Sequence, residues 1–291
     1  MQDDFELKIS RQVERLKTGS ARAIEREVAE KRIAWYRRNH PASAGRGGAS
    51  PRQGYDLIFR EYMGLSEAEL PILAESDAEI VWKSQNRCQT LEACGALGLD
   101  TRKVCRGMFE KSTQALLSCL DPQLRFLRSY ETIRPYAGHC EERIVKVDFA
   151  AMMRLAIGEA RLSRGEGNKG YGAVVALGDR IIGQAHDMAI TAKDPSLHAE
   201  VNAIRQAVRE LGDPDLSGAV LFSSCEPCPM CSSLAVWANL STIVYGMSIQ
   251  DTARLGKARI LVGSEQIVNN SPVMIEIIGG VLQDECAPLY T

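Results

Sequence analysis

The chain has 291 residues, and the usual size of a domain predicts about two domains. Its 35 Lys and Arg side chains against 37 Asp and Glu give a net charge of −2, which argues against a polyanion as the main partner. A composition of 45% hydrophobic and 25% charged residues excludes a disordered or fibrous chain. No run approaches the ~18 apolar residues of a membrane span, and MQDDFELK lacks a signal-peptide core, so we expect a cytoplasmic protein without membrane contact.

Residues 1–54 are expected to form a helical arm and a linker. The basic bias of the chain lies here, because residues 1–60 hold 13 basic and 8 acidic side chains. Apolar residues recur at helical spacing over 5–38, which predicts one or two amphipathic helices broken near Thr18-Gly19-Ser20. Residues 40–54 are rich in Gly, Ser, Ala and Pro without apolar periodicity, which indicates a flexible linker.

Residues 55–146 are expected to form a mostly helical module that is rich in cysteine. A strand is predicted at Glu79–Trp82, and helices at Thr90–Leu97 and Lys103–Cys119. Five cysteines lie in this region: Cys88, Cys94, Cys105, Cys119 and Cys140. Their spacing lacks the close C-x₂₋₄-C pairs of zinc fingers, so buried thiols are the default interpretation and a metal or ligand site is the alternative.

Part of this module resembles a known family. Residues 86–142, with CQTLEACGALGLDTRKVCRGMFEKSTQALLSCLDPQLRF and YETIRPYAGHCEE, are similar to the L-2-amino-thiazoline-4-carboxylic acid hydrolase family. The resemblance implies a folded module that binds a small ligand, and it assigns no chemistry.

Residues 147–291 show a regular alternation of helices and strands. The predicted elements are a helix Asp148–Ser163 with Asp148 as N-cap, a hairpin of Gly172–Leu177 and Arg180–Ala185 around Gly178-Asp179, a helix His198–Leu211, a strand Ala219–Ser223, a helix beginning near Pro229 and a strand Thr242–Tyr245. This order predicts a layered α/β domain.

Two short motifs at the starts of predicted helices carry the chemistry. They are His198-Ala199-Glu200 and Pro227-Cys228-Pro229-Met230-Cys231. The pair H-x-E and P-C-x-x-C is the zinc-deaminase pattern, in which one His and two Cys hold Zn²⁺ and the Glu is an acid/base. Cys228 and Cys231 lie one turn apart at a helix N-terminus, whose dipole favours thiolates. The motifs therefore predict zinc on His198, Cys228 and Cys231, with Glu200 as the catalytic residue.

Three protein ligands leave a fourth zinc position open for water, as in catalytic sites. Zinc lowers the pKa of that water toward ~7, and the resulting hydroxide would attack the substrate while Glu200 passes the proton to the ring nitrogen and the leaving amine. The products would be a carbonyl compound and ammonia. A structural zinc knot with Cys225 as fourth ligand, or a redox C-x-x-C, are the alternatives, and both leave Glu200 unexplained.

The second half as a whole resembles the cytidine/deoxycytidylate deaminase superfamily, in the branch of guanine deaminases and tRNA-specific adenosine deaminases. DPSLHAEVNAIRQA, LFSSCEPCPMC, IVYGMSIQDT and GGVLQDECAPL carry the resemblance. It implies a three-layer α/β/α fold around a five-stranded mixed sheet, the zinc site described above, and a homodimer that completes its active sites across the subunit interface.

The resemblance also implies substrate contacts, and this chain departs from the pattern at two of them. Asp187 stands where relatives have a base-contacting Asn, so the substrate is expected to offer extra N–H donors or positive charge there. Relatives carry Pro two residues before the Gly-Ala-Val of the first strand, whereas this chain has Gly170-Tyr171-Gly172 there, and Tyr171 would stack on a ring. Gly172 and Ala199 are the other candidate contacts. The alternatives are that Asp187 caps a turn and that Tyr171 packs in the core.

The leading hypothesis is a zinc-dependent aminohydrolase of a small amino-substituted heterocycle, guanine-like or related. The main alternative is a tRNA-specific adenosine deaminase, which must hold the RNA backbone with Lys and Arg. A second alternative is a ligand-sensing or scaffold protein with a degenerate deaminase fold. Residues 151–291 hold 11 basic and 15 acidic side chains, which favours a small molecule over nucleic acid without excluding the latter.

Overall fold

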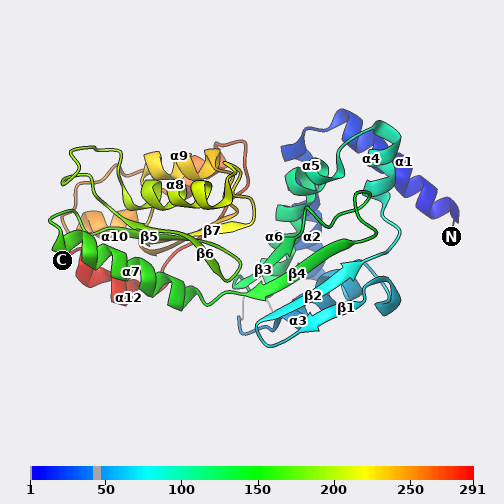
Figure 1. The fold of residues 1–291 in the computed structure, drawn as a ribbon, viewed down its shortest axis with the longest axis horizontal. Helices are drawn as coiled ribbons and strands as arrows, with labels where there is room; N and C mark the ends of the chain where they lie inside the picture. The colour runs from blue at the N-terminus through cyan, green and yellow to red at the C-terminus, as the bar shows by residue number, and fades with distance from the viewer. Residues whose placement is uncertain (1, 42–46) are drawn as a thin grey trace. The chain divides into compact units, whose positions relative to one another are not determined.

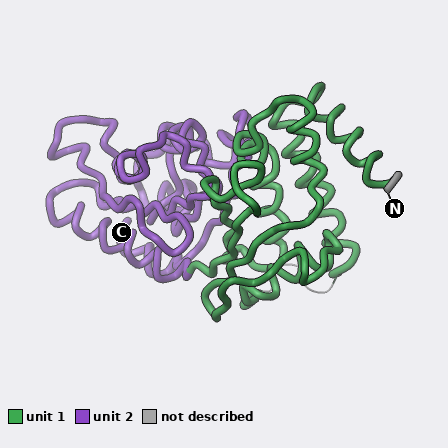
Figure 2. Tube along the Cα trace, turned by 45° about the vertical axis from the view of Figure 1, so that its right-hand side comes forward, with its two compact units in different colours: residues 1–147 green, residues 148–291 purple. Residues whose placement is uncertain are grey.

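The computed structural model describes residues 2–41 and 47–291, and residues 42–46 of the predicted linker lie outside them (Figure 1). The chain forms two compact units, residues 1–147 and residues 148–291 (Figure 2). The helices of the predicted arm belong to the first unit together with the cysteine-rich module. Across the described part of the chain, no helix has the length and apolar character needed to cross a bilayer.

The two N-terminal helices form as predicted, with the break at Gly19. Helix α1 spans Gln2–Thr18 and α2 spans Ala21–Asn39. Ser20 is the N-cap of α2, where its hydroxyl accepts a hydrogen bond from the Ala23 amide at 3.3 Å. The sequence predicted a linker through Gly54, but helix α3 begins at Pro51, because Ser50 and Gln53 form a reciprocal capping box.

Helices make up most of unit 1, as expected, and α2 packs against α6. After α3 the helical elements are η1 (Asp56–Tyr62), η2 (Glu67–Glu69), α4 (Gln89–Leu97), α5 (Thr101–Cys105), η3 (Arg106–Glu110) and α6 (Lys111–Leu120). The predicted helix Lys103–Cys119 thus corresponds to the continuous run of α5, η3 and α6.

Unit 1 also contains a four-stranded antiparallel sheet, of which the sequence predicted one strand. Its order is β1 (Ile72–Glu75), β2 (Glu79–Ser84), β4 (Cys140–Lys146) and β3 (Leu124–Arg128). Only β2 shows strict alternation of burial. Strand β1 is exposed throughout and β3 is buried at four consecutive residues, so neither has the period-two pattern that identifies a strand in a sequence.

The sheet of unit 2 has five strands and is mixed, as predicted. Its order is β6 (Arg180–His186), β5 (Gly172–Leu177), β7 (Ala219–Cys225), β8 (Thr242–Met247) and β9 (Glu276–Ile278). Strand β5 runs antiparallel to both β6 and β7, whereas β8 runs parallel to both β7 and β9.

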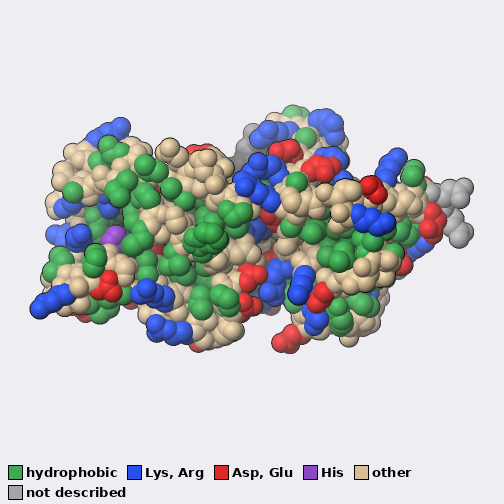
Figure 3. All heavy atoms as spheres, turned by 90° about the horizontal axis from the view of Figure 1, so that it is seen from above, with side chains coloured by type: hydrophobic (Ala, Val, Ile, Leu, Met, Phe, Trp, Pro, Cys, Tyr) green, Lys and Arg blue, Asp and Glu red, His purple; other side chains and the backbone are tan. Residues whose placement is uncertain are grey.

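Helices cover both faces of this sheet and complete the three layers (Figure 1). Helix α7 (Phe149–Gly165) lies on one face, and α8 (Ala199–Leu211) and α9 (Pro229–Trp237) lie on the other, where hydrophobic side chains gather on the surface of the unit (Figure 3). As predicted, Asp148 caps α7 by accepting a hydrogen bond from the Ala151 amide at 2.9 Å. The later elements α10 (Ile249–Arg254), α11 (Ser264–Asn269), α12 (Gln283–Cys286) and η4 (Ala287–Leu289) were not predicted.

Candidate active site

Three side chains with metal-ligating atoms meet between α8 and α9. His198 Nδ1 lies 3.7 Å from Cys228 Sγ and 3.6 Å from Cys231 Sγ, and the two sulfur atoms are 3.6 Å apart. Within residues 2–41 and 47–291, this is the one group of three or more potential ligands whose donor atoms converge, all within 4.8 Å. Neither Cys225 nor the five cysteines of unit 1 belong to it. One imidazole nitrogen and two thiol sulfurs are a donor set that fits zinc.

Helix starts place these ligands. His198 is the N-cap residue of α8, and Cys228 is the N-cap residue of α9, with Pro229 at its first position and Cys231 in its first turn. The free amides of a helix start favour negative charge, and Pro is suited to the first helical position because it lacks an amide hydrogen. The local sequence therefore turns both cysteine sulfurs toward the imidazole.

A buried carboxylate fixes the segment before α9. Both oxygens of Glu226 accept backbone hydrogen bonds, from the Ile249 amide at 2.9 Å and from the Ser264 amide at 2.8 Å. These bonds tie the segment to the starts of α10 and α11. The Ser232 hydroxyl adds a hydrogen bond to the Pro227 carbonyl at 3.0 Å. Hydrogen bonds to α10, to α11 and from Ser232 of α9 thus fix the backbone that carries Cys228 and Cys231.

The pKa values of the two thiols in this group favour the binding of a cation. Hydrogen bonding from Cys231, assisted by His198, lowers the pKa of Cys228 to about 4. The same hydrogen bond and burial raise the pKa of Cys231, since one thiolate stabilised beside it disfavours a second. A cation bound by both sulfurs would remove that conflict by stabilising both thiolates.

Glu200 lies directly beside the ligand group and is buried. Its Oε1 accepts a hydrogen bond from the Ser223 hydroxyl at 3.1 Å, and its Oε2 lies 3.4 Å from Cys231 Sγ. Burial raises the pKa of Glu200. A buried carboxyl group beside a candidate metal site is suited to accept and return a proton. Ser223, which orients it, was not foreseen, although it lies in the SSC run that precedes the P-C-x-x-C motif.

Asp187 follows β6 and is completely buried. Its Oδ1 accepts a hydrogen bond from the Ala189 amide at 3.3 Å, as a turn-capping residue would. Its Oδ2 is buried and has no hydrogen-bond partner among the described residues. The hydrogen bond with Cys228 raises the pKa of His198, and the negative charge of Asp187 adds to that rise, so the carboxylate lies within electrostatic range of His198. Turn capping therefore accounts for only one of its two oxygens.

Tyr171 is held between two side chains that the sequence did not connect with it. Its ring stacks on Tyr290 with centroids 5.4 Å apart, and the Arg259 guanidinium carbon lies 4.7 Å from its centroid. Burial raises the pKa of Tyr171 to about 12. Arg259 also donates to Cys225 Sγ at 2.9 Å, and the Tyr290 hydroxyl donates to Ser224 Oγ at 2.8 Å. No motif marks Arg259 or Tyr290, because both reach this place from distant irregular segments.

Gly172 and Ala199, the remaining predicted contacts, have packing roles in the structure. A Cβ atom on Gly172 would lie 2.0 Å from the Ala156 carbonyl oxygen of α7, so only glycine permits this approach of helix and strand. The Gly172 amide donates to Ser224 Oγ at 3.1 Å. The Ala199 side chain is fully buried in the apolar core of unit 2.

Comparison with known proteins identifies the family. The model of the cytidine and deoxycytidylate deaminase zinc-binding region matches residues 147–247. The tRNA-specific adenosine deaminase of Bacillus subtilis is 32% identical over 139 residues, which cover 48% of this chain and 84% of that protein. The chain belongs to the cytidine and deoxycytidylate deaminase family. The guanine deaminase of the same organism is 40% identical over 86 residues, which cover 30% of this chain and 55% of that enzyme.

Solved structures also resemble part of the chain. One from a study of A-to-I editing by tRNA:A34 deaminases at the wobble position of transfer RNA is 27% identical. It covers 48% of this chain and 98% of its own, with a TM-score of 0.43. The match of the family model at residues 147–247 begins at the boundary between the two units and otherwise lies within unit 2.

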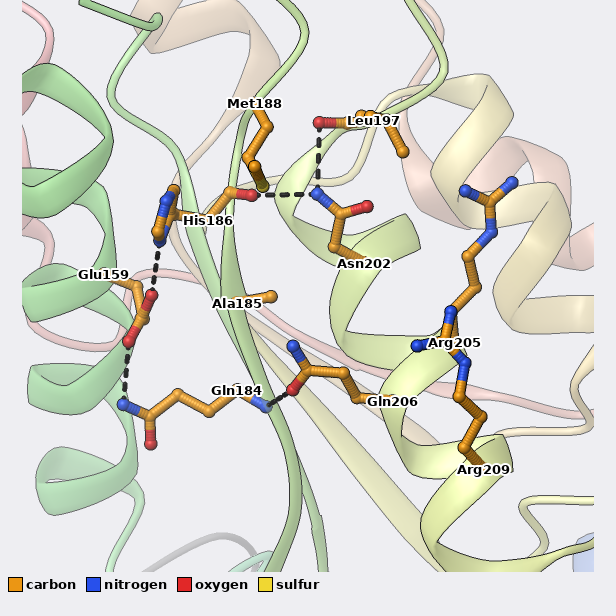
Figure 4. A pocket seen from close by; sticks show the side chains of 10 residues that line it. All are labelled: Glu159, Gln184, Ala185, His186, Met188, Leu197, Asn202, Arg205, Gln206 and Arg209. Atoms are coloured by element: carbon orange, nitrogen blue, oxygen red, sulfur yellow. Dashed lines mark hydrogen bonds and ion pairs between the residues drawn. The ribbon is translucent and has the colours of Figure 1, made fainter. Parts of the chain in front are cut away.

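The deaminase domain also has a cavity of about 280 Å³ at the edge strand β6, and none of the predicted site residues lines it (Figure 4). His186 lines this cavity with its Nδ1 2.7 Å from Glu159 and its Nε2 3.0 Å from Glu166. Gln206 of α8 accepts a hydrogen bond from the Gln184 amide at 3.0 Å. Side chains thus satisfy the polar groups of this edge, and His186 is a satisfied histidine rather than a metal ligand.

Proposed function

We propose that residues 147–291 form a zinc-dependent hydrolytic deaminase of a small amino-substituted heterocycle, with a guanine-like nucleobase as the substrate class. The observation that carries the proposal is the buried Glu200 beside the converging His198, Cys228 and Cys231. The similarity to a protein named guanine deaminase supports the choice of substrate. The degenerate-scaffold alternative is disfavoured, since no member of this set has been replaced.

His198, Cys228 and Cys231 would hold the zinc ion. When bound, zinc supplies Lewis acidity that makes a water molecule nucleophilic at neutral pH. Glu200 takes the proton of that water on Oε2, while the Ser223 hydroxyl at 3.1 Å keeps the carboxylate from rotating away. The same carboxyl would donate that proton to the ring nitrogen, then take the second proton from the added hydroxyl and pass it to the amine, so that the C–N bond breaks, a carbonyl forms and ammonia leaves. Burial raises the pKa of Glu200, which helps the carboxylate to take up the proton.

Asp187 would set the specificity. Its Oδ2 is a buried acceptor without a donor, and a buried acceptor that stays unpaired costs about 1–3 kcal/mol. A substrate N–H group, or a protonated ring nitrogen, would satisfy it, whereas a substrate carbonyl would be repelled. Heterocycles that carry additional amino groups are therefore the preferred members of the class.

A tRNA-specific adenosine deaminase is the second candidate. The relative of that name is matched over 84% of its length, more than the guanine deaminase. The basic residues of the first 60 positions would offer phosphate contacts. The acidic balance of the deaminase half is the argument against it.

The two candidates are separated by incubating the zinc-loaded full chain with guanine, with 2,6-diaminopurine and with an anticodon stem-loop that has adenosine at the wobble position. We expect ammonia release from a free base and no inosine in the RNA. Inosine without turnover of free bases would replace the first function with the second. Glu200→Gln is the matched control: turnover should fall at least ~100-fold while the zinc content is unchanged, because the acid/base is lost but no ligand is.

A further inference from the structure

Unit 1 contains a buried cluster of arginines in which one ion pair is complete. Arg128, at the end of β3, donates from Nε and Nη2 to Glu142 Oε1 at 2.8 and 2.5 Å. The other oxygen of Glu142 accepts from Trp82 Nε1 at 3.2 Å and from the Ser84 hydroxyl at 2.5 Å. Both oxygens of Glu142 are occupied, so its charge is matched by Arg128.

Arg32 of α2 points into the same region without a carboxylate partner. Its Nη1 donates to the Thr113 hydroxyl at 2.6 Å and to the Ser112 hydroxyl at 3.1 Å. Both hydroxyls donate in turn to the Phe109 carbonyl, at 2.8 and 2.9 Å, so they serve Arg32 only as neutral acceptors. A neutral acceptor stabilises a buried cation less than an anion does.

Donor groups of both arginines are left over. Arg32 Nε and Arg128 Nη1 are buried and have no hydrogen-bond partner among the described residues. Burial lowers the pKa of Arg32, interaction with the Tyr62 side chain raises it, and the charges of Arg128 and Glu142 lower and raise it in turn, so Arg32 lies within electrostatic range of the Arg128–Glu142 pair. A buried cation with an unsatisfied N–H group is unfavourable, and structures rarely keep one without a reason.

The other acidic group nearby is already engaged. Glu110 accepts a short hydrogen bond from the Tyr130 hydroxyl, and burial raises its pKa, which reduces its negative charge. The Arg106 guanidinium carbon lies 4.4 Å from the Tyr130 ring centroid and adds positive charge on that side. The cluster thus keeps two N–H donors, Arg32 Nε and Arg128 Nη1, without an acceptor among the described residues.

We propose that unit 1 binds a small oxyanion, the carboxylate or phosphate group of a small molecule, between Arg32 and Arg128. Guanidinium groups present N–H donors in a planar fork that matches the two oxygens of such a group. The anion would accept from Arg32 Nε and Arg128 Nη1, the two buried donors that lack an acceptor among the described residues. This site lies wholly within the residues of unit 1 and is independent of the deaminase proposal.

The test is a titration of the full chain with sodium phosphate, with sodium acetate and with sodium chloride at matched ionic strength. The readout is the ¹⁵N signal of the Arg32 Nε–H group, assigned by its absence in Arg32→Met. We expect a saturable shift with phosphate or with acetate and none with chloride, and the stronger of the two identifies the group. The absence of a saturable shift with either oxyanion would overturn the proposal and leave an ordered water as the partner.

Thermal unfolding gives the second measurement. The oxyanion should raise the unfolding temperature of the wild type, and Arg32→Met should abolish that rise without lowering the temperature in chloride, since it removes an uncompensated charge. Arg102→Met, at an exposed arginine of the same unit, should keep the rise. If Arg32→Met fails to fold, Arg32→Lys replaces it, and the apparent dissociation constant should increase at least tenfold because the fork is lost. A rise that Arg32→Met or Arg32→Lys retains in full would contradict the site.

Discussion

The single unpaired oxygen of Asp187 gives the most direct prediction at the residue scale. Replacing this carboxylate by an amide, Asp187→Asn, adds a donor where the structure has an acceptor. The ratio of kcat/KM for 2,6-diaminopurine to that for guanine should fall by about 10- to 100-fold, the equivalent of one buried hydrogen bond exchanged for an unpaired donor. Steady-state kinetics on both bases checks this. The control is Asp179→Asn, the same change at an exposed turn position, which should leave the ratio unchanged. An unaltered ratio in Asp187→Asn would show that Asp187 does not take part in substrate recognition.

His186 gives a pH-dependent prediction. Partial burial lowers its pKa, but hydrogen bonds to Glu159 and Glu166 outweigh that and raise it. A raised folded-state pKa means that this contribution to stability is fully present below about pH 6.5 and is lost as the pH rises through the folded-state value. The free-energy difference between wild type and His186→Gln, measured by urea unfolding, should shrink between pH 6 and pH 9. This change in the free-energy difference should be below ~1 kcal/mol, because Glu166 is half exposed and solvent screens its ion pair with His186.

The matched control for this effect is His139→Gln, since His139 makes no ion pair with the described residues. A difference for His186→Gln that does not vary with pH would mean that the two carboxylates do not bind a protonated imidazole.

At the scale of elements, the packing of α7 on β5 depends on a missing side chain. Gly172→Ala would place a Cβ atom 2.0 Å from the Ala156 carbonyl oxygen and 2.4 Å from the Ala160 amide nitrogen, both backbone atoms that cannot move aside alone. We expect a loss of about 1–3 kcal/mol in the free energy of unfolding, measured by chemical denaturation. Gly158→Ala within α7 meets nothing within 4 Å and should stabilise by ~0.5–1 kcal/mol. Equal effects of the two changes would contradict this account of the helix–strand contact.

The same elements explain what could be predicted from the sequence. His198, Glu200 and the two cysteine ligands are fixed by helix starts that local residues encode, such as Pro229 at the first position of α9. Strand β9 has only three residues, too few to show a periodic pattern in the sequence. Arg259 and Tyr290 come from irregular segments, so their contacts with Tyr171 depend on tertiary packing that no local pattern predicts. Gly172 shows a different ambiguity, because in a sequence a glycine required by close packing resembles one required by a ligand.

At the scale of the whole molecule, the exposed face of α9 predicts association of two chains. Trp237 is 77% exposed, and Met230, two turns earlier on the same helix, is 39% exposed. Beside Trp237 lies a cavity of about 390 Å³ that includes Val262, which follows the exposed Ile260 and Leu261. A contiguous apolar patch of this kind marks an interface more often than free surface. Because α9 also carries Cys231, a second copy bound here would lie close to the metal ligands.

Trp237→Glu should therefore convert a homodimer into a monomer, because a charge buried at an apolar interface is unpaired and costly. Sedimentation equilibrium of the zinc-loaded full chain measures the mass directly. Turnover should fall in the monomer while the zinc content is unchanged, since the ligands themselves stay intact. Leu162→Glu is the matched control: Leu162 is 56% exposed, but it lies on α7, on the opposite face of the sheet, so dimerisation and activity should persist. A wild-type chain that sediments as a monomer, or a Trp237→Glu variant that remains dimeric, would place the interface elsewhere or exclude it.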